Sequence, residues 1–138
     1  MTNPDETAAT PGSCLCGAVR FEVIGRTPPV GMCHCSKCRK VSGTGSNAVL
    51  NIRKERLNWI CGEDQLRMFA LPSGWGPTFC GVCSCPAPQL TPEGDRYLVP
   101  AGSLDVDPGP RVAGHIFVGS RASWDVIGDD GPQFDETP

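Results

Sequence analysis

Closely spaced cysteines are the residues of this sequence best suited to chemistry. They fall into three groups along the chain, which are Cys14 and Cys16, then Cys33, Cys35 and Cys38, then Cys80 and Cys83 with Cys85 close behind. Thiolates bind zinc strongly, and short spacings of this kind are typical of zinc knuckles. The chain has nine cysteines, an odd number that a framework of paired disulfides would not use up. Metal binding is therefore the preferred interpretation, and disulfide bonding is the alternative.

The first and last groups have the spacing of a structural zinc site. Such a site needs four ligands in a closed tetrahedron, commonly from two knuckles that lie far apart in the chain. Cys14 with Cys16, and Cys80 with Cys83, meet this requirement and would tie together the two ends of the strand-rich region. The alternative for Cys80 and Cys83 is a redox-active pair, because C-x-x-C also occurs in thiol oxidoreductases.

The middle group offers three thiolates, one fewer than a closed site needs. Zinc held by three protein ligands keeps a fourth position open for water or substrate, as catalytic zinc does. We therefore expect Cys33, Cys35 and Cys38 to hold an open, catalytic zinc. Two alternatives stay open: His34 supplies the fourth ligand, or Cys38 is only a buried helix residue and the group binds no metal.

The chemistry of such an open site follows from its charge. Three thiolates leave the zinc site net negative, so it would be poor at converting water to hydroxide. A small thiol in the open position would lose its proton yet remain nucleophilic, and its attack on an aldehyde gives a hemithioacetal. We expect Arg39 and Lys40 to pair with carboxylates of that thiol. The acid–base candidates His34, Ser42 and His115 are assigned no catalytic role.

Short strands must position these cysteines, because the chain is rich in residues that interrupt helices. It holds 17 glycines and 14 prolines among 138 residues, which nearly excludes an all-helical fold. Short apolar or alternating segments predict strands at residues 19–23, 48–52, 57–60, 66–71, 97–99 and 115–118. One short helix is expected after Cys35, with Ser36 as its N-cap and Ser42-Gly43 at its end.

A single small domain accounts for the length of the chain. Residues 1–11 are expected to form a flexible leader, with ordered structure beginning at Cys14. The β domain is expected to span residues 12–127. Residues 128–138 are expected to be an acidic, poorly ordered tail unless Phe134 anchors it.

Charge and hydropathy exclude two classes of function. The formal net charge is −3, and adjacent bases occur only at residues 39–40 and 53–54, too few for a nucleic-acid-binding face. No apolar run is long enough to cross a membrane, and the N-terminus lacks the pattern of a secretory signal. We expect a cytoplasmic protein without nucleic-acid or membrane partners, for which the sequence leaves a homo-oligomer open.

Three motifs, in order, resemble the family of glutathione-dependent formaldehyde-activating enzymes. They are Gly12-Ser13-Cys14-Leu15-Cys16-Gly17-Ala18-Val19-Arg20-Phe21, then Cys33-His34-Cys35-Ser36-Lys37-Cys38-Arg39-Lys40 with Ser42-Gly43, and then Phe79-Cys80-Gly81-Val82-Cys83. The C-terminal half of the family is matched by Gly102-Ser103-Leu104-Asp105, His115-Ile116-Phe117-Val118 and Trp124. The resemblance therefore covers residues 12–124.

This resemblance implies a mainly β, Mss4-like (β-tent) fold with antiparallel sheets, zinc knuckles and one short helix. It implies two zinc sites, a structural one on Cys14, Cys16, Cys80 and Cys83 and a catalytic one on Cys33, Cys35 and Cys38. The namesake reaction joins glutathione and formaldehyde into S-hydroxymethylglutathione, which implies a carbon–sulfur lyase of the S-(hydroxymethyl)glutathione synthase type. The alternatives are a thiol–disulfide switch and a non-catalytic zinc module that binds a protein partner, as the centromere-protein branch of the family suggests.

The second knuckle departs from the pattern of the family, which continues it with glycine. This chain has Ser84 and then Cys85 at that place. A glycine there relieves a position that needs positive φ, so we expect Ser84 to strain the turn or Cys85 to replace Cys83 as a ligand. Cys61 matches no motif and is expected to be a small buried hydrophobe.

The chain has three tryptophans, Trp59, Trp75 and Trp124, and we expect them to be core residues. Trp75 is of particular interest, because its loop leads into the second knuckle. That position would allow it to border the open metal.

Overall fold

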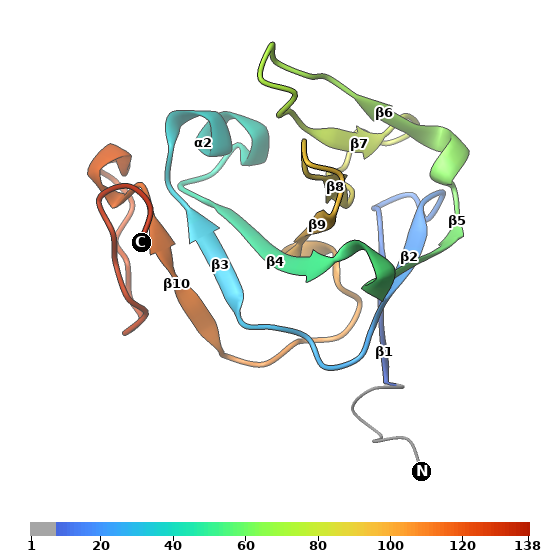
Figure 1. Ribbon diagram of the computed structural model, residues 1–138, viewed down its shortest axis with the longest axis horizontal. Helices are drawn as coiled ribbons and strands as arrows, with labels where there is room; N and C mark the ends of the chain where they lie inside the picture. Colours follow the sequence, from blue (N-terminus) through green and yellow to red (C-terminus); the bar gives the residue numbers. More distant parts are fainter. Residues whose placement is uncertain (1–7) are drawn as a thin grey trace.

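The computed structural model describes residues 8–138, which form strands joined by short helical turns (Figure 1). The strands within this range are β1 (Ala9–Ser13), β2 (Arg20–Ile24), β3 (Val30–Cys33), β4 (Asn47–Arg53), β5 (Leu57–Cys61), β6 (Leu66–Met68), β7 (Thr78–Cys80), β8 (Gln89–Leu90), β9 (Arg96–Pro100) and β10 (Val112–Ile116). Among residues 8–138, the α-helix is α2 (Ser36–Ser42), and the short 3₁₀ turns are η1 (Lys54–Arg56), η2 (Glu63–Gln65), η3 (Ala101–Ser103) and η4 (Val118–Ser120).

The strands form three sheets. The largest has the order β10-β3-β4-β9-β8, a second has the order β1-β2-β5, and β6 pairs with β7. Neighbouring strands run antiparallel except at one edge, where β10 runs parallel to β3. The expectation of a mainly β fold with antiparallel sheets and a short helix is confirmed, with this parallel pair as the exception.

The main core lies where the largest sheet packs against the sheet of β2 and β5. Its fully or nearly buried side chains are Phe21, Val23, Leu50, Ile52, Leu57 and Val99. Alternate residues of a strand point to opposite faces, so Leu50 and Ile52 of β4 turn inward while Val49 and Asn51 turn to the other face. Each buried aliphatic or aromatic side chain contributes about 1.5–3 kcal/mol to stability.

The N-terminal strand begins earlier than the sequence suggested. β1 pairs with β2 from Ala9 onward, so the predicted leader differs from the structure at residues 9–11. Gly12 allows this pairing, because a Cβ at that position would collide with the ring of Phe21. The rest of the predicted leader, residues 1–7, lies outside the described residues.

Helix α2 follows the expected position, with a different N-cap. Cys35, not Ser36, caps the helix, and its Sγ accepts the backbone N–H of Cys38 at 3.3 Å. The thiol takes this role because Cys35 is still extended, with ψ at 160°, while Ser36 is already helical. The predicted end is confirmed, because Gly43 adopts the left-handed conformation that stops a helix.

The C-terminal segment lies along the outer edge of β10 (Figure 1). Phe134 donates its backbone N–H to the carbonyl of His115 at 2.9 Å, and its own carbonyl accepts the backbone N–H of Val118 at 3.0 Å. Phe134 therefore anchors the C-terminal segment, which is the condition under which an ordered tail was expected. β10 ends at Ile116, two residues before the predicted end, because Phe117 has a left-handed φ of 56°.

The three tryptophans differ in burial. Trp59 packs edge-on against Phe21, with ring centroids 6.2 Å apart, and belongs to the core as expected. Trp75 is half-buried, whereas Trp124 is 69% exposed because it lies in a turn outside the sheets, so its placement in the core is wrong. Among residues 8–138, no helix is long and apolar enough to cross a membrane.

Candidate metal centres

Two groups of cysteines converge in space, and the first joins the two ends of the strand-rich region. The sulfurs of Cys14, Cys16, Cys80 and Cys83 all lie within 4.8 Å of one another. Cys16 Sγ lies 3.6 Å from Cys14 Sγ and 3.9 Å from Cys80 Sγ. Four thiolates about 2.3 Å from a tetrahedral zinc ion are about 3.8 Å apart, so this geometry is compatible with zinc.

Backbone amides surround this four-cysteine group. Val19 N–H donates to Cys14 Sγ at 3.3 Å, and Val82 N–H donates to Cys80 Sγ at 3.4 Å. Hydrogen bonds of this kind favour the thiolate, which is the form that binds metal. The backbone amide of Cys85 likewise lowers the pKa of Cys83 to about 6.

The turn after Cys83 shows the strain expected from the sequence. Ser84 has a φ of 68°, a conformation that glycine adopts without steric cost, and its N–H closes the turn onto the carbonyl of Cys80 at 2.8 Å. Of the two candidate fourth ligands, Cys83 lies in the described group of converging sulfurs and Cys85 lies outside it. Cys61 is exposed, not buried as expected, because β5 extends past the core at this end.

The second group consists of Cys33, Cys35 and Cys38, whose sulfurs also lie within 4.8 Å of one another. Cys33 ends β3, Cys35 caps α2, and Cys38 lies in the first turn of that helix. The change from extended strand to helix brings the three thiols together, as three ligands of one ion require. The hydrogen bond from Cys38 lowers the pKa of Cys33 to about 6, and the same contact raises the pKa of Cys38.

His34 lies between two of these cysteines in sequence and turns away from their sulfurs. Its Nε2 lies 2.9 Å from Nδ1 of His115, and its Nδ1 lies 3.4 Å from a carboxylate oxygen of Asp125. It therefore lies outside the described group that could hold a metal. Burial lowers the pKa of His34, which favours its neutral form.

The histidine pair continues to Asp129, a contact that the sequence did not suggest. His115 Nε2 lies 2.9 Å from Oδ1 of Asp129, and this hydrogen bond lowers the pKa of the carboxyl. Asp125 and Asp129 both come from the C-terminal segment, of which residues 128–138 were expected to form an acidic, poorly ordered tail. No local spacing pairs them with His34 and His115, because only the docking of this segment on β10 brings them together.

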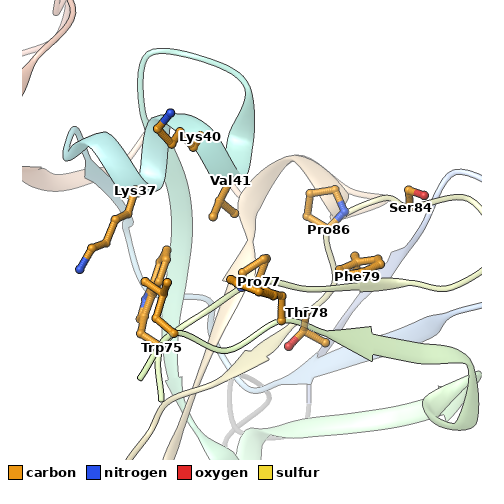
Figure 2. Close-up of a pocket in the computed structure, with 11 residues that line it drawn as sticks. Lys37, Lys40, Val41, Trp75, Pro77, Thr78, Phe79, Ser84 and Pro86 are labelled. Atoms are coloured by element: carbon orange, nitrogen blue, oxygen red, sulfur yellow. The ribbon is translucent and has the colours of Figure 1, made fainter. Parts of the chain in front are cut away.

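Two cavities, each of about 530 Å³, border α2 and share Trp75. Cys33, Cys38 and the outer face of β4 line the first, which we call the cysteine cavity. Lys37, Lys40 and Val41 line the second, which we call the lysine cavity, and Figure 2 shows them on the helix opposite Trp75 and Pro77. Trp75 thus borders the cavity that contains two of the three cysteines, as its place in the sequence suggested.

Comparison with known proteins identifies the family of the chain. The family model of the glutathione-dependent formaldehyde-activating enzyme matches residues 9–120. The chain belongs to this family. A curated protein of Halomonas elongata that is provisionally named as a glutathione-dependent formaldehyde-activating enzyme is 30% identical over 121 residues, which are 82% of this chain and 77% of that protein.

A solved structure supports the fold of this family member. The crystal structure of a Rhodobacter sphaeroides protein matches it with a TM-score of 0.57 and 22% identity. The match covers 69% of this chain and 87% of that one. The fold of the chain therefore recurs in a solved structure. The geometry of its own two cysteine groups is compatible with metal binding.

Proposed function

We propose that the protein joins a small thiol such as glutathione to an aldehyde such as formaldehyde, as a zinc-dependent carbon–sulfur lyase resembling S-(hydroxymethyl)glutathione synthase. The observation that carries this proposal is the convergence of Cys33, Cys35 and Cys38 beside a cavity that two of them line. The name of the family and of the Halomonas elongata relative supports the same substrates.

Two zinc ions belong to this proposal, and the cysteines divide into two ligand sets. The four-cysteine group of Cys14, Cys16, Cys80 and Cys83 would hold a structural ion with a closed tetrahedron, since its sulfur spacing matches that geometry. The three-cysteine group would hold the catalytic ion, which supplies an open position that lowers the pKa of a thiol.

The residues of the chain bind and orient the reactants. Lys37 and Lys40 line the lysine cavity and can attract the carboxylates of the thiol, a role that the sequence assigned to Arg39 and Lys40. Arg39 lines neither cavity, and its Nε is buried without a hydrogen-bond partner. The thiol sulfur bonds to the carbonyl carbon, the π electrons move to oxygen, and that oxygen takes the proton that the thiol released.

A reducing compartment suits this chemistry. All nine cysteines are free thiols in the structure, and both the metal sites and the thiol substrate need reduced sulfur. A cytoplasmic location is therefore part of the proposal.

The test compares Cys35→Ser with Cys61→Ser. Serine is a good N-cap, so Cys35→Ser preserves the cap of α2 while removing one thiolate. We expect about two zinc ions per wild-type chain and about one in Cys35→Ser, with loss of the acceleration of hemithioacetal formation measured by exchange NMR. Cys61 is exposed and outside both groups, so its variant should keep both properties.

Two outcomes would contradict the proposal. Full acceleration by Cys35→Ser would show that the three-cysteine group does not carry the reaction. Wild-type protein that holds two zinc ions and accelerates no thiol–aldehyde addition would instead favour the non-catalytic zinc module.

A further inference from the structure

The cysteine cavity lies on the face of the largest sheet that turns away from the core. Asn47, Val49 and Asn51 alternate along β4 with the core residues Leu50 and Ile52, and all three line the cavity. Cys33 and Cys38 form part of the same wall. A molecule bound here therefore lies beside the three-cysteine group.

The walls of this cavity are apolar. Its larger apolar side chains are Met32, Val49, Trp75, Leu98, Ile116 and Phe134. Among the described residues that line it, none is a lysine, arginine, aspartate or glutamate. An anionic ligand would lose its hydration here without a lysine or arginine side chain to pair with, whereas a neutral apolar group would gain from leaving water.

The cavity has few polar groups, and some of them already form hydrogen bonds within the protein. His115 is 1% exposed, with Nδ1 on His34 and Nε2 on Asp129, so neither ring nitrogen is free for a ligand. The thiols of Cys33 and Cys38 belong to the proposed metal site, so Asn47 and Asn51 remain and can donate to a neutral oxygen such as that of a carbonyl group.

The volume of the cavity exceeds what formaldehyde requires. Formaldehyde has two heavy atoms and fills little more than the space of two water molecules, at about 30 Å³ each. The cavity measures about 530 Å³. The carboxylates of a thiol such as glutathione match the lysine cavity, which shares Trp75, better because Lys37 and Lys40 line it.

We infer that the cysteine cavity binds the carbonyl substrate and selects a neutral aldehyde that carries an apolar group of several carbons, aliphatic or aromatic. This inference rests on the proposed function for its reaction, but not for binding. In the reaction the thiol sulfur forms a bond to the aldehyde carbon, the C=O π bond breaks, and the oxygen takes the proton that left the sulfur. No oxidant or reductant is needed.

The first experiment measures binding without reaction. Phenylethanol and isoamyl alcohol have the apolar groups of the expected aldehydes but no carbonyl, and glycolate provides a small charged control. We expect calorimetry on the zinc-loaded protein to show that both alcohols bind at least about tenfold more tightly than glycolate.

The second experiment measures reaction with glutathione. Phenylacetaldehyde and isovaleraldehyde should be accelerated at least about tenfold more, in kcat/KM, than formaldehyde or glyoxylate, because each buried methylene favours the larger substrate. Exchange NMR separates this acceleration from the uncatalysed addition.

Variants locate the ligand. Val49→Asp places a charge on the cavity wall and should lower alcohol affinity at least about tenfold. Ile60→Asp changes an exposed side chain of β5 outside the cavity and should leave that affinity unchanged. If Val49→Asp does not fold, Leu98→Ala removes an apolar contact from the same wall and should also weaken binding.

The outcomes separate the two proposals. Alcohol binding without acceleration of any aldehyde would refute the proposed function and retain the ligand class of the cavity. Acceleration of formaldehyde alone, without alcohol binding, would refute the inference and retain the function. A dimer in light scattering that Val49→Asp dissociates would assign the cavity to a second copy of the chain and overturn the inference.

Discussion

Ser84 adopts a backbone conformation that is sterically unfavourable for a residue with a side chain. Its φ of 68° places it in the left-handed region, where a residue with a Cβ costs about 1–2 kcal/mol more than glycine. The turn is retained because it brings Cys83 to the other three sulfurs of its group.

Replacing this serine by glycine should stabilise the protein. We expect Ser84→Gly to raise the free energy of unfolding by about 0.5–1 kcal/mol, since the greater freedom of glycine in the unfolded chain offsets part of the relieved strain. Urea unfolding of the zinc-loaded protein measures the change. Ser123→Gly is the matched control, because Ser123 is exposed and has no positive φ, and a similar gain there would refute the explanation.

At the scale of elements, the C-terminal segment is joined to β10 by side chains as well as by backbone. Asp129 lies against His115, and the N–H of Gly131 donates to the same carboxylate at 2.8 Å. The hydrogen bond from His115 lowers the pKa of Asp129, so the folded state favours the charged form. This contribution to stability is present above the unfolded pKa, about 4, and is lost as pH falls through the lower folded pKa.

Asp129→Asn should therefore be less stable than the wild type at neutral pH. The difference in the free energy of unfolding between the two proteins should narrow as pH falls below about 4, where the wild-type carboxyl also becomes neutral. Urea unfolding across a pH series measures it, with the exposed Asp130→Asn as control. Acid protonates thiolates in all three proteins, so they are compared with one another at each pH. A difference that stays constant with pH would contradict this account.

At the scale of the whole molecule, the two cysteine groups differ in what they connect. The four-cysteine group joins the β1–β2 turn to the end of β7, and Cys16 and Cys80 are 64 positions apart in the sequence. The three-cysteine group lies within a single strand–helix connection and borders a cavity. Loss of metal from the first group should therefore affect the fold far more than loss from the second.

A chelator should remove zinc in two steps. The first ion should leave from the three-cysteine group with little change in melting temperature. Removal of the second should unfold the chain, because a structural zinc ion contributes about 10 kcal/mol or more, comparable to the whole stability of a domain. Native mass spectrometry and circular dichroism follow the two steps. Simultaneous loss of both ions, or a folded metal-free protein, would contradict this order.

Much of the local structure was determined by the sequence alone. Alternation located most of the strands, and the cysteine spacing identified both groups that converge in the structure. Gly43 marked the end of α2, and the absent glycine at position 84 indicated strain. These features depend on a few neighbouring residues, whose conformations follow from backbone sterics and side-chain periodicity.

Only the tertiary structure decided which distant groups meet. The parallel pairing of β10 with β3 places His115 against His34, and the docked C-terminal segment adds Asp125 and Asp129. The same packing leaves the outer face of β4 beside the cysteines as an apolar cavity. Contacts of this kind depend on the register and order of strands far apart in the chain, and the whole core selects these, not any local spacing.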